Sequence, residues 1–337
     1  MRVMIVGAGA IGGFLAAKIH QGGHEVCVVA RGPHLAAIQA DGLRLRSPDG
    51  AEIIAKVAAD DGPERFGSQD LVITTLKAPA LPSMLPRLGA ALAAGAPLAA
   101  AMNGVFWWYG HGFKVGGQEA DTRRLDPDGA LAAIPPQRAM GIVIHSTNEV
   151  IAPGVVQNRS AKNRFVIGGP TAESMATAAT IADALNGPGL TMLADADIRR
   201  VMWRKLLRNL SSAPASVLTG GEAYDVLNDP DARSVAQALF AEGAAVAATH
   251  GFSELAQEAP DVFRVGGGAR QKPSMSQDVD RGRPMEIDTI LRSVQDFARQ
   301  CAVPTPTLDT VIALVLLRAR LVGAYPRPPA QQPADGQ

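Results

Sequence analysis

The first fourteen residues of the chain, MRVMIVGAGAIGGF, restrict its fold more than any other stretch. The apolar run from Arg2 to Val6 is rich in β-branched residues and predicts a short buried strand. Three glycines follow at once, and a helical pattern then runs on to His20. Strand, glycine turn and helix together are typical of a dinucleotide-binding βαβ unit, because glycines permit the tight turn, the approach of a pyrophosphate and close helix packing. The predicted phosphate-binding loop is Gly7, Ala8, Gly9, Ala10, Ile11 and Gly12.

Two other interpretations of this stretch are a glycine-rich turn in another kind of α/β protein and a secretory signal peptide. The glycines interrupt the apolar run, and a second strand pattern, Glu25 to Ala30, follows where a mature domain would only be starting. We therefore reject the signal peptide and keep the glycine-rich turn as the alternative.

The end of the second predicted strand indicates which dinucleotide binds. An NAD-preferring site usually has Asp or Glu at this position, where the carboxylate accepts hydrogen bonds from the ribose 2′-hydroxyl. Here the position is occupied by Arg31. A guanidinium binds a 2′-phosphate bidentately, whereas a carboxylate repels it. We predict NADP(H) as the cofactor, with a surface arginine that merely ends the strand as the alternative.

Composition excludes several classes of function. The chain has 337 residues, 47% of them hydrophobic, and its 32 Lys and Arg balance its 32 Asp and Glu. Such a balance argues against a nucleic-acid or membrane-surface partner. The two cysteines have no metal-ligand spacing and the six histidines form no HxxxH pair, so no metal site and only reduced thiols are expected. We expect a soluble, cytoplasmic protein that acts on a small molecule, and we leave a homodimer open.

Strand and helix patterns alternate through the first half of the chain, and helical patterns dominate the second. The predicted fold class is α/β, with a Rossmann-type dinucleotide-binding domain over 1–193, an all-helical domain over 194–324 and a disordered Pro- and Gln-rich tail over 325–337. The segment 107–137 has no clear pattern and is interpreted as a lid, an interface element or a disordered insertion. Further elements are predicted as strands at Leu43–Leu45, Ile53–Val57, Leu71–Thr75, Pro97–Met102, Ala139–His145 and Arg164–Ile167, and as helices at His34–Ala40 and Leu81–Leu92.

A lysine in the helical half lies on an unexpected side of its helix. At 100° per residue, Lys205 falls within the apolar arc of the predicted helix, and Asn209 lies one turn further along the same arc. The lysine either extends its ammonium out to solvent or presents it to a cleft as a proton donor. Two other polar residues also have structural alternatives: Ser274 with Gln277 fits a capping box, and Glu286 fits the first turn of a helix.

Taken together, these segments resemble one family, the ketopantoate reductases (2-dehydropantoate 2-reductases) of the wider 6-phosphogluconate-dehydrogenase-like group. The resemblance covers about residues 1 to 320, and its C-terminal motif is much more specific than the glycine loop. The motifs in chain order are GAGAIG, Arg31, Thr75-Leu76-Lys77, Asn103-Gly104, Trp203-Arg204-Lys205 with Asn209, Lys272-Pro273-Ser274-Met275 and Gly282-Arg283-Pro284-Met285-Glu286-Ile287-Asp288.

The resemblance implies NADPH-dependent reduction of 2-dehydropantoate to pantoate, a step in pantothenate and coenzyme A synthesis. It also implies a role for each matching residue. The glycines hold the pyrophosphate and Arg31 meets the 2′-phosphate. Lys205 is the general acid, and Glu286 places the lysine and binds cofactor or substrate. The remaining implied contacts are Lys77 close to the cofactor, Asn103 between nicotinamide ribose and substrate, and Asn209 and Ser274 on substrate oxygens.

Two departures from the family pattern bear on the substrate. The family usually has a second asparagine one turn beyond Asn209, where this chain has Ala213 followed by Pro214. An aromatic run, Val105 to Tyr109, follows Asn103-Gly104 and either reshapes the pocket or packs as a lid or dimer contact. A reductase of a different 2-oxo acid is therefore the first alternative, and a non-catalytic NADP-binding sensor is the second.

Overall fold

The computed structural model describes residues 1–327, which form two compact units, one from Met1 to Leu206 and one that begins at Leu207. The boundary between the units lies inside one helix, α6 (Ile198–Thr219), whereas the predicted domain boundary lies between residues 193 and 194. Those domain limits stay a prediction. Most of the tail predicted to be disordered, 328–337, lies outside the described residues, while Tyr325 donates a hydrogen bond to Asp288 at 2.8 Å.

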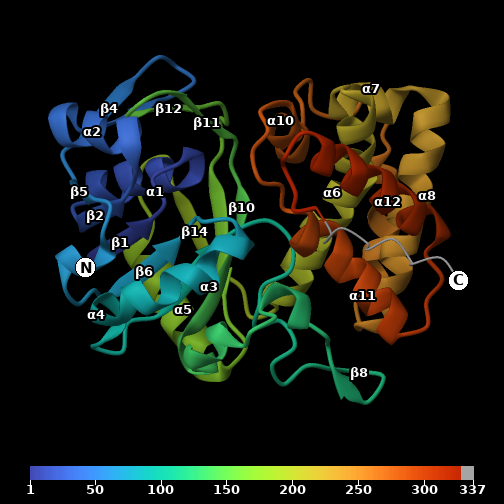
Figure 1. Ribbon diagram of the computed structural model, residues 1–337, viewed down its shortest axis with the longest axis horizontal. Coiled ribbons are helices and arrows are strands. Elements are labelled where there is room, and N and C mark those ends of the chain that lie inside the picture. Colours follow the sequence, from blue (N-terminus) through green and yellow to red (C-terminus); the bar gives the residue numbers. More distant parts are fainter. Residues whose placement is uncertain (328–337) are drawn as a thin grey trace, which may run out of the picture. The chain divides into compact units, whose positions relative to one another are not determined.

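The first unit is built on an eight-stranded sheet (Figure 1). Its six strands from β5 to β10 are parallel, and β13 runs antiparallel to β10 and parallel to β14. The order is that of a doubly wound dinucleotide-binding sheet. From edge to edge the strands are β14 (Thr191–Ala194), β13 (Arg164–Gly168), β10 (Ala139–His145), β7 (Leu98–Ala101), β6 (Leu71–Thr74), β1 (Arg2–Val6), β2 (Glu25–Val29) and β5 (Ala58–Asp60).

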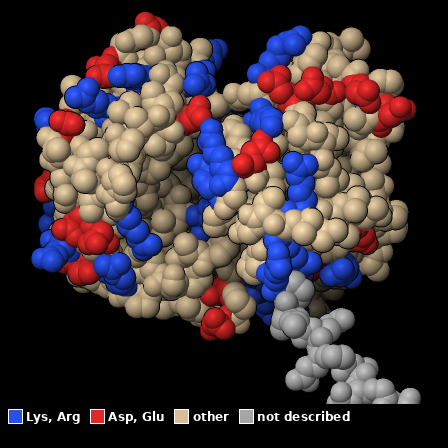
Figure 2. Space-filling view, turned by 45° about the horizontal axis from the view of Figure 1, so that its top comes forward, with Lys and Arg blue, Asp and Glu red and all other residues tan. Residues whose placement is uncertain are grey.

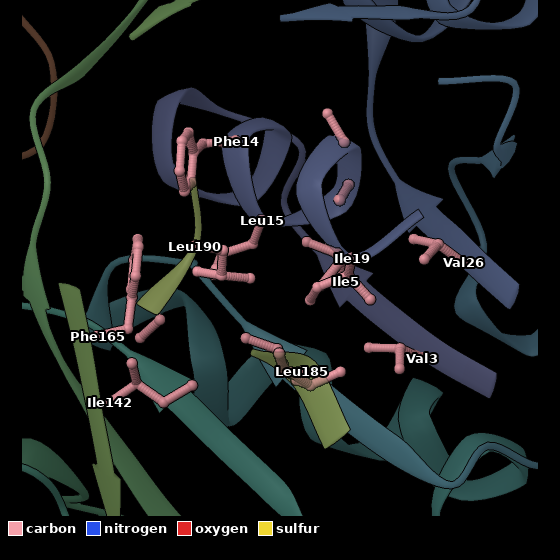
Figure 3. Packing of buried hydrophobic residues seen from close by; sticks show 14 of the residues in the cluster. Val3, Ile5, Phe14, Leu15, Ile19, Val26, Ile142, Phe165, Leu185 and Leu190 are labelled. Carbon is pink, nitrogen blue, oxygen red and sulfur yellow. The ribbon is translucent and has the colours of Figure 1, made fainter. Parts of the chain in front are cut away.

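Helix α1 (Ala10–Gln21) packs on this sheet and also contacts a second, four-stranded sheet. The second sheet has the order β11 (Asn148–Ala152), β12 (Val155–Asn158), β3 (Leu43–Arg46) and β4 (Glu52–Ala55). A Cβ at Gly13 would stand 2.7 Å from the Val156 side chain, so the absence of a side chain lets α1 approach β12 closely. Figure 3 shows the core that results, in which Phe14 stacks on Phe165 with 5.7 Å between ring centroids.

The structure corrects some of the predicted elements. The helix predicted over Leu81–Leu92 is broken into α3 (Leu81–Met84), a 3₁₀ turn and α4 (Gly89–Leu92), because Pro86 lacks the amide hydrogen that a continuous helix needs there. Strands β5, β11, β12 and β14 were not predicted. The remaining helices of the first unit are α2 (Gly32–Asp41) and α5 (Ala172–Leu185), and α5 begins with a capping box between Thr171 and Ser174.

The segment 107–137 is ordered, so its interpretation as a disordered insertion is wrong. It forms a short hairpin of β8 (Lys114–Val115) and β9 (Gln118–Glu119) together with 3₁₀ turns. Its aromatic residues are packed: Trp108 stacks on Phe106, and the Trp203 indole donates a hydrogen bond to the Tyr109 hydroxyl at 2.8 Å. Arg199 fixes the segment by donating to the carbonyls of Tyr109 and His111.

The second unit is helical. It contains the C-terminal part of α6, followed by α7 (Ala223–Asn228), α8 (Pro230–Thr249), α9 (Ala259–Val262), α10 (Ser274–Asp280), α11 (Ser293–Gln300) and α12 (Pro306–Leu321). The Glu242 carboxylate accepts hydrogen bonds from the amides of Thr307 and Leu308 at 2.9 and 2.8 Å, which satisfies the N-terminus of α12. A Cβ at Gly243 would stand 2.8 Å from Leu210, so α8 lies closely against α6.

The described residues contain charged side chains of both signs and both cysteines. Basic and acidic side chains are interspersed on the face seen in Figure 2. Both cysteines are free, and burial raises the pKa of the Cys27 thiol to about 12. Within residues 1–327 no helix is long and apolar enough to cross a membrane. Across the same range, no three His, Cys, Asp or Glu side chains gather as metal ligands would.

A buried histidine of the second unit predicts sensitivity to acid. Burial lowers the pKa of His250 to about 4, whereas an unfolded chain has a histidine pKa of about 6.5. The unfolded state therefore binds a proton that the folded state does not, and up to about 3 kcal/mol of stability is lost as pH falls from about 6.5 to 4. We expect the melting temperature of His250→Gln to fall less between pH 7.5 and pH 5 than that of the wild type. His111→Gln, at an exposed histidine, is the control and should behave like the wild type; equal acid sensitivity of all three proteins would contradict the prediction.

Candidate active site

The loops that carry the predicted cofactor residues all follow parallel strands of the large sheet. The carboxyl ends of parallel strands meet at one edge, and ligands of doubly wound sheets bind outside that edge. The topology therefore brings these residues of the first unit to the same edge. They are the glycine loop after β1, Arg31 after β2, Lys77 after β6 and Asn103 after β7.

The glycine loop has the geometry that a pyrophosphate site requires. Gly7 has a φ of 97°, which disfavours any other residue, and its amide donates to the Val29 carbonyl at 3.0 Å. A Cβ at Gly12 would overlap the Gly7 carbonyl oxygen, so the first turn of α1 lies directly against the end of β1. At Gly9, in contrast, a Cβ would meet no atom within 4 Å. The loop thus leaves room above Gly9, at the N-terminus of α1, where free amide groups and the helix dipole favour an anion.

Thr75 supports the loop and was not assigned a role from the sequence. Its hydroxyl donates to the Gly7 carbonyl at 2.5 Å, and its amide donates to the Val6 carbonyl at 2.9 Å. The residue therefore connects the end of β6 to the turn after β1. Lys77, two residues further on, is half-buried and precedes a 3₁₀ turn.

Arg31 is placed to bind an anion. It is exposed, and within residues 1–327 its guanidinium makes no hydrogen bond or ion pair. It is also the N-cap residue of α2, whose N-terminal dipole favours negative charge nearby. A 2′-phosphate at this position would meet both the guanidinium and the helix end.

Lys205 and Asn103 are brought together by the first unit. The Lys205 ammonium donates to Asn103 Oδ1 at 2.7 Å and to the carbonyl of Ile144, near the end of β10. These two hydrogen bonds fix the position of the ammonium. The alternative in which Lys205 extends into solvent is wrong, because the side chain is half-buried and held at the carboxyl edge of the sheet. The Ile144 carbonyl was not found from the sequence, since every residue has one.

The other predicted site residues belong to the second unit. Asn209 is half-buried on α6 and makes no side-chain hydrogen bond among the described residues. Ser274 is exposed and is the first residue of α10, whose N-cap position belongs to Pro273. The capping box expected at Ser274 is therefore wrong, and the Gln277 amide instead donates to the Lys272 carbonyl at 2.9 Å.

Glu286 is buried and lies immediately before the helical run 287–300. Its carbonyl accepts a hydrogen bond from the Ile290 amide at 3.2 Å, and a π-helical segment, Asp288–Arg292, follows. The motifs around Ser274 and Glu286 are joined by an ion pair of 3.1 Å between Asp278 and Arg283. The two motifs that carry the family resemblance in this unit thus form one connected structure.

Comparison with known proteins shows to which family the chain belongs. Family models of the ketopantoate reductase PanE/ApbA and of its C-terminal domain match residues 3–117 and 197–319. A 2-dehydropantoate 2-reductase from Mesorhizobium japonicum is 40% identical over 329 residues, which cover 96% of this chain and all of the relative. The chain belongs to the ketopantoate reductase family.

Solved structures agree with this membership. A PanE/ApbA family ketopantoate reductase from Ralstonia eutropha has a TM-score of 0.76 and 26% identity, covering 96% of this chain and 99% of that one. A D-mandelate dehydrogenase solved with NADH and anilino(oxo)acetate has a TM-score of 0.81 at 21% identity, with coverage of 96% and 100%. At that identity the second likeness concerns the fold alone.

Substitutions at two glycines of the loop should affect ligand binding and stability differently. Gly9→Ala should leave the melting temperature close to that of the wild type, because its Cβ meets only open space, but should weaken binding of a dinucleotide that needs this space. Gly12→Ala should lower the melting temperature strongly, because its Cβ overlaps the Gly7 carbonyl. Thermal unfolding and cofactor titration of both variants test this. A Gly9→Ala protein that binds NADPH as well as the wild type would place the pyrophosphate elsewhere.

Proposed function

We propose that this protein is an NADPH-dependent oxidoreductase acting on CH–OH groups, which reduces 2-dehydropantoate to pantoate in pantothenate and coenzyme A synthesis. The observation that carries the proposal is the Lys205 ammonium held by Asn103 and the Ile144 carbonyl at the carboxyl edge of the dinucleotide-type sheet. Membership of the ketopantoate reductase family supports the substrate. The cytoplasmic location expected from the sequence belongs to the same proposal.

The cofactor assignment rests on the fit of the first unit to NADP(H). The glycine loop offers room and amide donors for the pyrophosphate, and the unpaired Arg31 suits the 2′-phosphate. Lys77 and Asn103 follow neighbouring strands and are proposed to lie along the nicotinamide half. Bound NADPH would supply the hydride.

In this proposal Lys205 is the general acid. Negative charge develops on the C2 oxygen of the 2-oxo acid during reduction, and an adjacent ammonium both stabilises that charge and donates the proton. Asn103 keeps the ammonium in place through its 2.7 Å hydrogen bond. Asn209 and Ser274 are proposed to donate to substrate oxygens, since amide and hydroxyl groups suit a carboxylate. Glu286 is proposed to orient Lys205 and the bound ligands.

The second candidate function is reduction of a different 2-oxo acid. The position of the family's second asparagine is occupied by the buried Ala213, which has no hydrogen bond to offer a substrate hydroxyl. NADPH oxidation with 2-dehydropantoate, measured beside simpler 2-oxo acids, tests the proposal. Preference for 2-dehydropantoate by kcat/KM supports it, and preference for another acid supports the alternative. No turnover with any acid would favour a non-catalytic NADP sensor.

Arg31 should determine the choice between cofactors. We expect the wild type to bind NADPH more tightly than NADH, and Arg31→Ala to lose most of the difference, because only the 2′-phosphate distinguishes the two. Lys18→Ala, at another basic residue of the first unit, is the control and should keep the preference. Equal affinity of the wild type for both cofactors, measured by titration, would refute the NADP(H) assignment.

Lys205 should be essential for turnover but not for cofactor binding. Lys205→Ala should lower kcat by about two to four orders of magnitude, since it removes the proton donor, while the Kd for NADPH changes little. Arg208→Ala on the same helix removes an exposed partner of Glu258 and should retain activity. Near-normal turnover of Lys205→Ala would show that this lysine is not the acid.

A further inference from the structure

His34 connects three parts of the first unit through its two ring nitrogens. The residue lies in the first turn of α2 and is half-buried. Its Nε2 is 2.6 Å from the carbonyl oxygen of Ala8, inside the glycine loop. Its Nδ1 accepts a hydrogen bond of 3.0 Å from the amide of Gly154, in the turn between β11 and β12. The imidazole thus bridges the glycine loop and the second sheet.

The two contacts define which nitrogen carries the proton. A backbone amide can only donate, so Nδ1 must be the unprotonated acceptor, and a carbonyl can only accept, so Nε2 must carry the hydrogen. His34 is therefore the neutral tautomer with its N–H on Nε2. Its donor is used on a single atom, the Ala8 carbonyl oxygen.

Holding that oxygen also orients the next amide. The Ala8 carbonyl and the Gly9 N–H belong to one planar trans peptide unit, so they point in opposite directions. With the oxygen turned toward His34, the Gly9 N–H points away from the imidazole. The space beside Gly9 is open, since no atom lies within 4 Å of the position of a Cβ. The Gly9 N–H is the group that the pyrophosphate of a bound dinucleotide would meet at the N-cap of α1.

The position of His34 is itself fixed from the other side. Gly154 has a φ of 70°, and a Cβ there would stand 3.0 Å from the Cβ of Ala37 on α2, so the turn lies closely against that helix. The Gly154 carbonyl accepts a hydrogen bond of 2.8 Å from the Arg44 amide of β3. The turn therefore cannot move away from α2 without breaking contacts in the second sheet.

We propose that His34 is a positioning residue for cofactor binding, which aims the Gly9 amide at the pyrophosphate by holding the Ala8 carbonyl. The four-stranded sheet serves as the rigid support for this imidazole. The inference rests on the proposed dinucleotide cofactor and goes beyond it, because it gives a function in binding to a residue outside the glycine loop.

Three substitutions separate the two hydrogen bonds. His34→Phe keeps a ring and removes both bonds, His34→Asn keeps an oxygen near the Nδ1 position, and His34→Gln keeps an N–H near the Nε2 position. We expect Phe and Asn to raise the Kd for NADPH about three- to tenfold, the effect of one hydrogen bond, and Gln to stay within about twofold of the wild type. The KM for NADPH should rise in parallel, while kcat at saturating NADPH stays unchanged.

The cofactor pair gives a second readout. NADPH and NADH share the pyrophosphate, so His34→Phe should weaken both by the same factor, unlike Arg31→Ala. The matched control is His24→Phe, because His24 Nε2 also holds a backbone carbonyl, that of Ala184 at 2.9 Å, but outside the glycine loop. This control should leave both affinities unchanged.

The outcomes distinguish the inference from the proposed function. A wild type that binds neither NADPH nor NADH would overturn the proposed function. A wild type that binds NADPH, together with a folded His34→Phe protein that binds it equally well, would overturn the role of His34 alone. Rescue by Asn in place of Gln would also overturn it, because the Gly154 bond would then matter and the Ala8 bond would not.

Discussion

The first turn of α1 lies so close to the end of β1 that a side chain at Gly12 would overlap the Gly7 carbonyl oxygen. This approach brings the N-terminus of the helix to the carboxyl edge of the sheet. It also leaves the Gly7 carbonyl within reach of the Thr75 hydroxyl, which joins β6 to the loop. The second sheet packs on the other side of the same helix, where Gly13 again has no side chain. The arrangement of α1 at the carboxyl edge of the large sheet, where the cofactor is proposed to bind, depends on the lack of a side chain at Gly12 and Gly13.

Much of this arrangement was predictable because it is local. The β1–α1–β2 unit follows from three glycines between two apolar runs, and the strands of the large sheet are short apolar segments, which are typical of buried parallel strands. The missed strands lack that signal. The residues of β11, for example, are half-buried or exposed, so the segment shows neither a continuous apolar run nor a clear alternation. The broken helix over Leu81–Leu92 shows that apolar periodicity overestimates a helix that has a proline, Pro86, in its interior.

The residues of the candidate site also differ in whether the sequence alone could reveal them. The sequence indicated Lys205 because a charged residue lies among apolar neighbours on one side of its predicted helix. In the structure this lysine contacts Asn103 at the carboxyl edge of the sheet. The Ile144 and Ala8 carbonyls are backbone groups. Because every residue has one, the residue type at these positions does not predict their roles. Their partners lie 61 and 26 residues away in the chain, so only the folded structure brings them together. Motifs therefore predict which side chains matter, whereas the groups that aim them are set by tertiary packing.

Arg199 attaches the segment 107–137 in a way that tolerates some changes of its sequence. Its guanidinium binds the main-chain carbonyls of Tyr109 and His111 and lies 4.9 Å from the centre of the Phe113 ring. Desolvation by these groups lowers the pKa of Arg199, yet two carbonyl acceptors keep the cation satisfied. Because these two hydrogen bonds reach backbone atoms, they do not depend on which side chains stand at positions 109 and 111. Substitutions at these two positions would therefore leave this anchor of the long loop in place.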